Sequence, residues 1–168
     1  GRDKSVINKI SEAISSTEGV YLLNVDPGKA TNRTVMTFVG EPEDVIHAAF
    51  NAAKVASELI DMSKHSGEHP RFGAMDVCPL TPVSNINFDE LIPYAHKLAE
   101  MISEKLGIPI YLYEKAAQKN ERQNLANVRS GEYEGLEEKI KKENWKPDYG
   151  LKFNKKSGAS AIGVRDFL

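Results

Sequence analysis

The residues best suited to chemistry lie in one short segment, 64–83, where ionisable side chains stand among glycines and prolines just before an apolar run. The ionisable members that matter here are His65, Glu68, His69, Arg71 and Asp76. Together they supply a proton donor, a proton acceptor and a cation that can bind an anion, the groups that general acid–base catalysis requires. We therefore predict an active-site loop in this segment rather than part of a hydrophobic core.

His69 is the first candidate for proton transfer, because imidazole is the side chain that ordinarily changes its protonation near neutral pH. Glu68 can orient the ring, and Pro70 restrains the preceding backbone toward extended conformations. Arg71 can bind a carboxylate through two parallel hydrogen bonds. An exposed histidine beside a turn would give the same pattern, so the catalytic and the surface interpretations both stay open.

The same segment gives little support for metal or thiol chemistry. His65 and His69 have the i, i+4 spacing that suits a metal on a helix, but a glycine and a proline nearby disfavour a helix there, and we predict no metal site. Cys78 lies inside the apolar run and is predicted to be a small buried hydrophobe. Asp76 is predicted either to complete the site or to cap the loop.

A second cluster lies in the turn-rich link 26–32 between two β-rich runs, 20–25 and 34–39, which we expect to pair as neighbouring antiparallel strands. Its candidate binding residues are Asp26, Asn32 and Arg33. Turn chemistry explains the first two, which can cap their own backbone, but it leaves Arg33 unexplained.

A third candidate is a glycine- and lysine-rich segment near the end of the chain. It consists of Gly150, Leu151, Lys152, Phe153, Asn154, Lys155, Lys156, Ser157 and Gly158. An aromatic ring and three lysines between glycines would suit a flat, polyanionic ligand. A flexible basic loop has the same composition, so the pattern alone does not decide between the two.

Hydrophobic spacing and end signals predict the elements that position these segments. The predicted helices follow Asp3 as far as Ser15, run from Pro42 to Ile60 and from Phe88 to Leu106 before Gly107, and occupy most of 114–142 in two pieces broken near Ser130-Gly131. The predicted strands are 20–25, 34–39, 75–83, 109–113 and a last one within 145–168. Pro79 and Pro82 favour an edge position for the strand at 75–83. Lys139 to Glu143 is predicted to be a solvated face.

The order helix, strand, strand, helix, strand predicts an α/β (α+β) fold. We expect a two-layer sandwich built on a ferredoxin-like βαββαβ unit that lacks its first strand and carries an extra helix and strand. With 168 residues, of which 40% are hydrophobic, the chain is long enough for one domain with a single sizeable core.

Net charge and cysteine content limit the classes of binding partner and the cellular compartment that the chain fits. The formal charge of -2 gives no general electrostatic attraction to nucleic acid or to anionic membranes, and no apolar run approaches the length of about 20 residues that a membrane span needs. A single cysteine fits a reducing compartment, so we expect a cytoplasmic protein. Both ends, at Gly1 and Leu168, are expected to be cuts within a longer sequence.

Several motifs along the chain occur together in one known family. They are Gly67-Glu68-His69-Pro70-Arg71, Gly73-Ala74, Asp76-Val77-Cys78-Pro79, and the stretches 31–35, 37–40, 59–63, 111–113 and 129–134. These motifs resemble the signature of glutamate formimidoyltransferase, the folate-dependent enzyme of histidine breakdown. The resemblance covers essentially the whole chain.

The resemblance implies transfer of a formimidoyl group from N-formimidoyl-L-glutamate to N5 of tetrahydrofolate, a co-substrate. It implies that His69 transfers the protons and that 150–158 contacts folate, although Ser157-Gly158-Ala159-Ser160 replaces a tryptophan-bearing stretch of the animal enzymes. Asp26 or Asp76 would hold the amidinium group of the donor, and Arg33 or Arg71 its carboxylates. Asn32 completes the expected substrate-binding set.

In this family two similar subdomains hold the substrate between them, and the chain resembles only the N-terminal one. We therefore expect the site to need a C-terminal subdomain or a second chain, and we expect a homodimer. Two alternatives remain: a truncated, non-catalytic subdomain that binds folate or a partner, and formyl transfer from N-formylglutamate.

Overall fold

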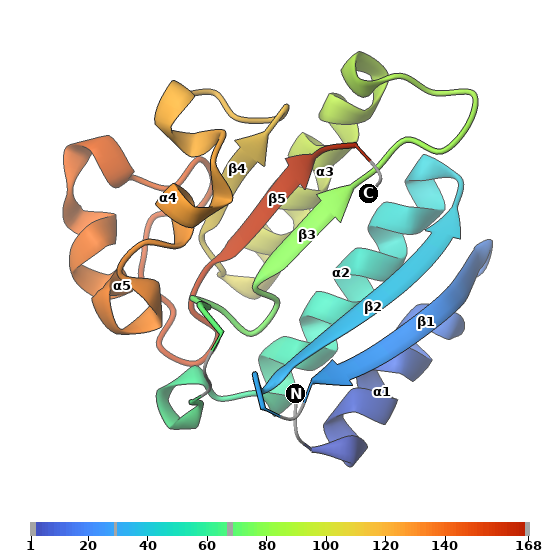
Figure 1. The fold of residues 1–168 in the computed structure, drawn as a ribbon, viewed down its shortest axis with the longest axis horizontal. Coiled ribbons are helices and arrows are strands. Elements are labelled where there is room, and N and C mark those ends of the chain that lie inside the picture. Colours follow the sequence, from blue (N-terminus) through green and yellow to red (C-terminus); the bar gives the residue numbers. More distant parts are fainter. Residues whose placement is uncertain (1–2, 29, 67–68, 167–168) are drawn as a thin grey trace.

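A computed structural model describes residues 3–28, 30–66 and 69–166, and its strands form two separate sheets (Figure 1). In the first sheet β1 (Val20–Gly28) pairs antiparallel with β2 (Arg33–Gly40). The second is parallel, in the order β3 (Val77–Leu80), β5 (Ser160–Val164), β4 (Ile110–Glu114). The mixed α/β class and the predicted order of elements are confirmed.

Three long helices lie together behind the strands in Figure 1: α1 (Lys4–Ser15), α2 (Pro42–Leu59) and α3 (Phe88–Leu106). The middle helix, α2, contacts both others. Its buried positions are almost all alanines, whose small side chains let neighbouring backbones approach closely. This helical layer covers both sheets on one side and encloses the main core.

The two sheets differ on their other side. Tyr111 and Tyr113 of β4 pack against Val128 and Leu136, which belong to the short helices α4 (Leu125–Arg129) and α5 (Glu132–Lys141). The β1–β2 ribbon instead packs on α1 and α2 through one face and exposes apolar residues, including Tyr21 and Leu23, which are 72% and 63% exposed. The three-stranded sheet is thus covered on both faces, and the ribbon on one.

The described part of the chain contains no hydrogen-bonded strand pair that joins the two sheets. In a complete ferredoxin-like unit the first strand lies between the strands that correspond to β2 and β3. These are the two strands that face each other across the separation in Figure 1. The separation between the two sheets therefore lies where the expected unit would place its first strand.

Sequence signals account for the ends of the helices. The Asp3 side chain accepts hydrogen bonds from two backbone N–H groups at the start of α1. Asn87 and Glu90 form a capping box at the start of α3, which ends at Gly107 with a positive φ of 68°. Pro42 occupies the first turn of α2, where its missing N–H costs nothing.

Three predictions of local structure are corrected. Only Val77–Leu80 of the predicted strand 75–83 is paired, although its edge position is confirmed. The predicted link 26–32 is shorter, because β1 extends to Gly28 and carries Asp26 within the strand. Residues 114–124 are not α-helical and contain one 3-10 turn, Asn120–Arg122, although the break before α5 is confirmed.

A fourth correction concerns the start of the stretch from Lys139 to Glu143, which we predicted to be a solvated face; the residues from Lys141 to Glu143 are exposed as predicted. Lys139 is only 7% exposed, and its Nζ donates hydrogen bonds to the carbonyl oxygens of Asn127, Val128 and Ser130. The lysine therefore binds carbonyl oxygens at the end of α4, where a helix leaves carbonyl groups without partners of its own. Two further 3-10 turns, Met62–Lys64 and Glu143–Trp145, complete the described elements.

Of the helices in the described ranges, none combines the length and the apolar character that crossing a bilayer would demand.

Candidate active site

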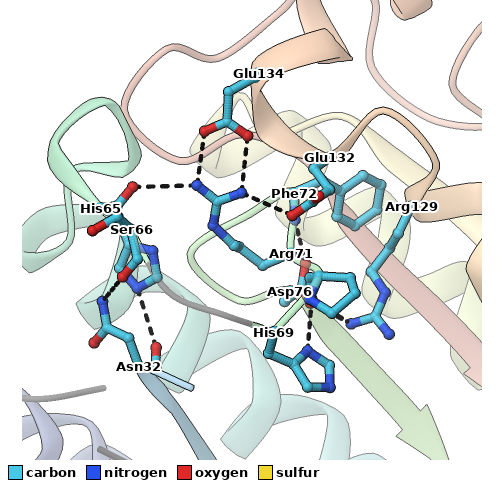
Figure 2. Close-up of polar contacts among 11 residues, drawn as sticks. Asn32, His65, Ser66, His69, Arg71, Phe72, Asp76, Arg129, Glu132 and Glu134 are labelled. Carbon is cyan, nitrogen blue, oxygen red and sulfur yellow. Dashed lines mark hydrogen bonds and ion pairs between the residues drawn. The ribbon is translucent and has the colours of Figure 1, made fainter. Parts of the chain in front are cut away.

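His69 lies half-buried between the tip of the β1–β2 ribbon and the start of β3. Its Nδ1 lies 2.7 Å from the carbonyl oxygen of Pro70, a group that can only accept a hydrogen bond, so Nδ1 carries a proton (Figure 2). In the neutral ring the lone pair is then on Nε2. The Nη1 atom of Arg33, which can only donate, lies 2.6 Å from Nε2 and 3.4 Å from Nδ1. The basic nitrogen of His69 therefore faces Arg33.

Arg71 fastens the loop to α5. The Glu134 carboxylate accepts hydrogen bonds from both of its terminal nitrogens, at 2.9 and 2.8 Å, and Glu132 accepts a third at 3.1 Å (Figure 2). The His65 carbonyl oxygen accepts another from Nη2. These contacts lower the pKa of Glu134, chiefly through the hydrogen bonds from Arg71. Both terminal nitrogens of the arginine are thus engaged by protein groups.

Asp76 caps the backbone of the same loop. One carboxylate oxygen accepts a hydrogen bond from the Phe72 N–H at 2.7 Å, and the other pairs with Nη1 of Arg129 at 2.7 Å (Figure 2). Burial raises the pKa of Asp76 in spite of these contacts. The same Nη1 of Arg129 also donates to the Pro70 carbonyl oxygen at 3.2 Å. Of the two expectations for Asp76, capping the loop is the one these contacts describe.

The backbone that follows His69 is held tightly against residues 157–159. Phe72 is buried, and its carbonyl oxygen accepts a hydrogen bond from the Ala159 N–H, while the Ala74 N–H donates to the Ser157 carbonyl. A Cβ atom on Gly73 would lie 1.7 Å from the Ala159 carbonyl oxygen, so only glycine fits there. The loop is consequently fixed from Pro70 to Asp76.

The ribbon tip reaches the same loop from the other side. The Asn32 side chain donates a hydrogen bond to the Ser66 carbonyl oxygen at 2.7 Å, and the backbone carbonyl oxygen of Asn32 lies 3.2 Å from Nε2 of His65 (Figure 2). Asn32 adopts a positive φ of 52°, which asparagine tolerates better than most residues. The structure therefore brings Asn32 and Arg33 together with the histidines of the loop.

Asp26 shares a face of the ribbon with Arg33. It pairs in register with Val35, and Arg33 lies two residues before Val35 on the same strand. Residues on one face at this diagonal spacing have Cα atoms about 7–8 Å apart. Met36 and Phe38 of the same strand pack toward α1 and α2, so Asp26 and Arg33 lie on the face away from these helices.

A cavity of about 710 Å³ adjoins the loop on the side of α5. Its lining residues are Met62, Ser63, His65, Tyr133, Glu134, Glu137, Phe153 and Lys155. The rings of Tyr133 and Phe153 lie with centroids 5.8 Å apart, and the Tyr133 hydroxyl donates to the Lys155 carbonyl oxygen. The cavity thus combines aromatic walls with charged groups.

The segment 150–158 divides into two parts. Phe153 and Lys155 line the cavity, and Leu151 is 89% exposed. Ser157 and Gly158 are buried beside Phe72, where a Cβ on Gly158 would lie 2.1 Å from the Phe72 carbonyl oxygen. The end of the segment therefore supports the loop that follows His69, and its middle lines the open space.

A sequence model described as the formiminotransferase domain, N-terminal subdomain, matches residues 1–165. The chain belongs to this family. It is 54% identical over its whole length to a formimidoyltransferase-cyclodeaminase of Dictyostelium discoideum, of which it covers 32%. It is 46% identical to the glutamate formimidoyltransferases of Thermoplasma acidophilum and Streptococcus pyogenes serotype M1, over 100% and 98% of its length, and covers 56% of each.

The family resemblance inferred from the motifs is thereby confirmed. The formiminotransferase subdomain spans between about a third and just over half of these relatives, so it represents part of their length. Its relatives are named as transferases of the formimidoyl group.

Sequence reasoning missed the partners that hold the loop of this formiminotransferase subdomain. Arg129, Glu132 and Glu134 lie more than 50 residues from the loop in sequence, and the only signal for them was their place in the motif 129–134. Glu68, expected to orient His69, lies outside the described residues.

The described ranges contain no group of three histidine, cysteine, aspartate or glutamate side chains placed to hold a metal ion. Burial raises the pKa of the Cys78 thiol to about 12, and the side chain packs against the main core.

Proposed function

We propose that this subdomain forms one wall of a cytoplasmic active site that transfers a formimidoyl group from N-formimidoyl-L-glutamate to N5 of tetrahydrofolate during histidine degradation. One observation carries the proposal: His69 is held by Pro70 with Nε2 free of a proton and facing the ribbon tip. A base in a fixed orientation, next to an arginine that can bind a carboxylate, is the arrangement that this transfer needs.

The reaction requires one proton to move twice. The N5 amine of the folate attacks the amidine carbon and forms a new C–N bond, and the proton of N5 passes to Nε2 of His69. The resulting tetrahedral centre collapses when His69 returns that proton to the glutamate nitrogen, and the C–N bond to glutamate breaks. The products are 5-formimidoyltetrahydrofolate and glutamate, and His69 ends as it began.

Arg33 is the better placed of the two arginines for the donor carboxylates. Both terminal nitrogens of Arg71 are engaged by Glu132, Glu134 and a backbone carbonyl, whereas Arg33 is exposed and contacts the His69 ring. A carboxylate that binds Arg33 would draw the guanidinium away from Nε2 and expose the lone pair to the reacting amine. Donor binding would thereby prepare the base.

Asp26 is the corresponding choice for the amidinium. It is exposed and shares the helix-free face with Arg33, whereas Asp76 is buried in its ion pair with Arg129. Asn32 completes the donor side by fixing the ribbon tip to the loop through Ser66.

The cavity beside α5 is our candidate for the folate. Its volume of about 710 Å³ falls in the range typical of small-molecule sites, and its aromatic walls suit a flat pteridine ring. Phe153 offers a ring for stacking, and Lys152 and Lys155 offer positive charge for the glutamate tail.

Because the chain covers only part of its relatives, we propose that a second subdomain, or a second chain in a homodimer, supplies the opposite wall. The exposed helix-free face of the ribbon is where such a wall would meet the donor site. A formyl donor would present a neutral amide instead of an amidinium, so an interaction with Asp26 favours the formimidoyl compound. A subdomain that only bound folate or a partner would not need an oriented imidazole.

The test is His69→Asn in a protein that contains both subdomains. We expect the turnover number for glutamate release from N-formimidoyl-L-glutamate to fall by about 10²–10⁴-fold, with a smaller change in KM, because general acid–base assistance is lost. His47→Asn, on the exposed face of α2, is the control and should leave turnover unchanged. Full turnover in the His69 variant would refute the role of His69. Equal rates with N-formylglutamate would instead point to formyl transfer.

A further inference from the structure

The carbonyl oxygen of Pro70 accepts two hydrogen bonds, one from Nδ1 of His69 at 2.7 Å and one from Nη1 of Arg129 at 3.2 Å. A carbonyl oxygen has two lone pairs, so both donors can bind it at once. The first of these bonds requires the proton of His69 on Nδ1, and Nη1 of Arg33, 2.6 Å from Nε2, favours the same tautomer. The direction in which the carbonyl points is set by the second.

Arg129 is itself fixed. It lies at the end of α4, and Nη1 pairs with Asp76 at 2.7 Å, with both side chains only 13% exposed. The Asp76 carboxylate in turn accepts a hydrogen bond from the backbone N–H of Phe72, two residues beyond Pro70 (Figure 2). One guanidinium nitrogen thus connects the carboxylate that caps the loop to the carbonyl that holds the imidazole.

We propose that Arg129 is a positioning residue that acts through the Pro70 carbonyl to keep His69 as the Nδ1–H tautomer, with Nε2 available as the base. An unconstrained histidine side chain prefers the proton on Nε2, so the protein must impose the opposite arrangement. Without the hydrogen bond from Arg129, the Pro70 carbonyl loses the contact that fixes its direction, and Nδ1–H loses a fixed acceptor. The proposal rests on the proposed function only for its catalytic consequence.

The decisive measurement is the tautomer of His69, read from the ¹⁵N chemical shifts of the ring in the histidine-labelled protein that contains both subdomains. All spectra are recorded in an Arg33→Met background, in which no guanidinium donates to Nε2 of His69. They are taken at alkaline pH, where imidazoles are neutral, and His69→Asn identifies the signal. The protein with Arg129 intact should show Nδ1–H. Arg129→Gln should shift at least half of the population to Nε2–H, and Arg129→Lys, which keeps the charge, should restore part of the native signal.

Ile102→Val is the matched control, because it removes one buried methylene from α3, outside the site. It should lower thermal stability and leave the tautomer unchanged. A folded Arg129→Gln protein with an unaltered tautomer would overturn the proposal. If the Arg129→Gln variant does not fold, the tautomer of His69 is measured in Asp76→Asn instead, because this substitution removes the carboxylate that fixes Arg129. An unaltered tautomer in Asp76→Asn would also overturn the proposal.

Turnover gives the second readout. Arg129→Gln should lower kcat by about 10- to 100-fold, as removal of an orienting partner typically does, with KM for the donor within about twofold of native. A raised KM with native kcat would contradict a positioning role and assign Arg129 to substrate binding. The tautomer result does not depend on activity, so an active His69→Asn protein would refute the proposed function without deciding the role of Arg129.

Discussion

The two sides of His69 are held in opposite ways. On the side of the three-stranded sheet, the Arg71 and Arg129 side chains are only 11% and 13% exposed and pair with carboxylates, and the backbone from Pro70 to Asp76 is fastened by hydrogen bonds. On the side of the ribbon, Arg33 is exposed on a face that no α1 or α2 side chain covers. Under the proposed function, the first side holds the catalytic base and the second receives the substrate. Substitutions on the first side should therefore affect stability, and substitutions on the second should affect binding.

The largest effect on stability should come from Gly73→Ala. The new Cβ would overlap the Ala159 carbonyl oxygen, which is backbone and cannot turn aside, so we expect a loss of about 3 kcal/mol in the free energy of unfolding. Urea denaturation measures this loss. Gly135→Ala, in α5, is the control: its Cβ would meet nothing within 4 Å, and we expect a gain of about 0.5–1 kcal/mol. An unchanged free energy of unfolding in Gly73→Ala would show that the loop is less tightly fixed than its contacts indicate.

Arg71→Met and Arg33→Met test the comparison directly. Arg71→Met removes charged hydrogen bonds and should lower the free energy of unfolding by about 2 kcal/mol. The expected loss is no larger because solvent screens Glu132 and Glu134, which are partly exposed. Arg33→Met should change stability by less than about 0.5 kcal/mol, as exposed substitutions do, and raise KM for the glutamate donor. Urea denaturation and steady-state kinetics measure the two effects. The opposite pattern, with KM changed by Arg71→Met alone, would make Arg71 the carboxylate ligand.

The sequence predicted what depends on neighbours in the chain. Asp3, Pro42 and Gly107 mark helix ends because caps act within a few residues, and the motif around His69 located the loop. It could not predict the pairing of Arg71 with Glu134, 63 positions away, or of Asp76 with Arg129, 53 positions away. Such pairs depend on how α4 and α5 pack against the sheet, which no local pattern encodes.

Lys139 illustrates the same limit. Its neighbours in sequence are charged, so the local pattern indicated a solvated surface. The side chain is instead buried because α4, eleven residues earlier, ends above it with carbonyl oxygens that need a donor. The burial of a charged residue is decided by the partners that the fold brings to it.

The smallest effect concerns acid stability on the fixed side. Because hydrogen bonds from Arg71 lower the pKa of Glu134 below its ordinary value of 4.5, the folded state holds this proton less tightly than the unfolded chain. The stabilisation is therefore complete above pH 4.5 and is lost as the pH falls through the lower, folded pKa. Glu134 is largely exposed, so its share should stay below about 1 kcal/mol. Urea midpoints from pH 7 downward should show a shallower decline for Glu134→Gln than for Glu138→Gln, which removes the same charge from α5 without touching Arg71. Identical declines in the two variants would mean that the ion pair between Arg71 and Glu134 does not contribute to the pH dependence of stability.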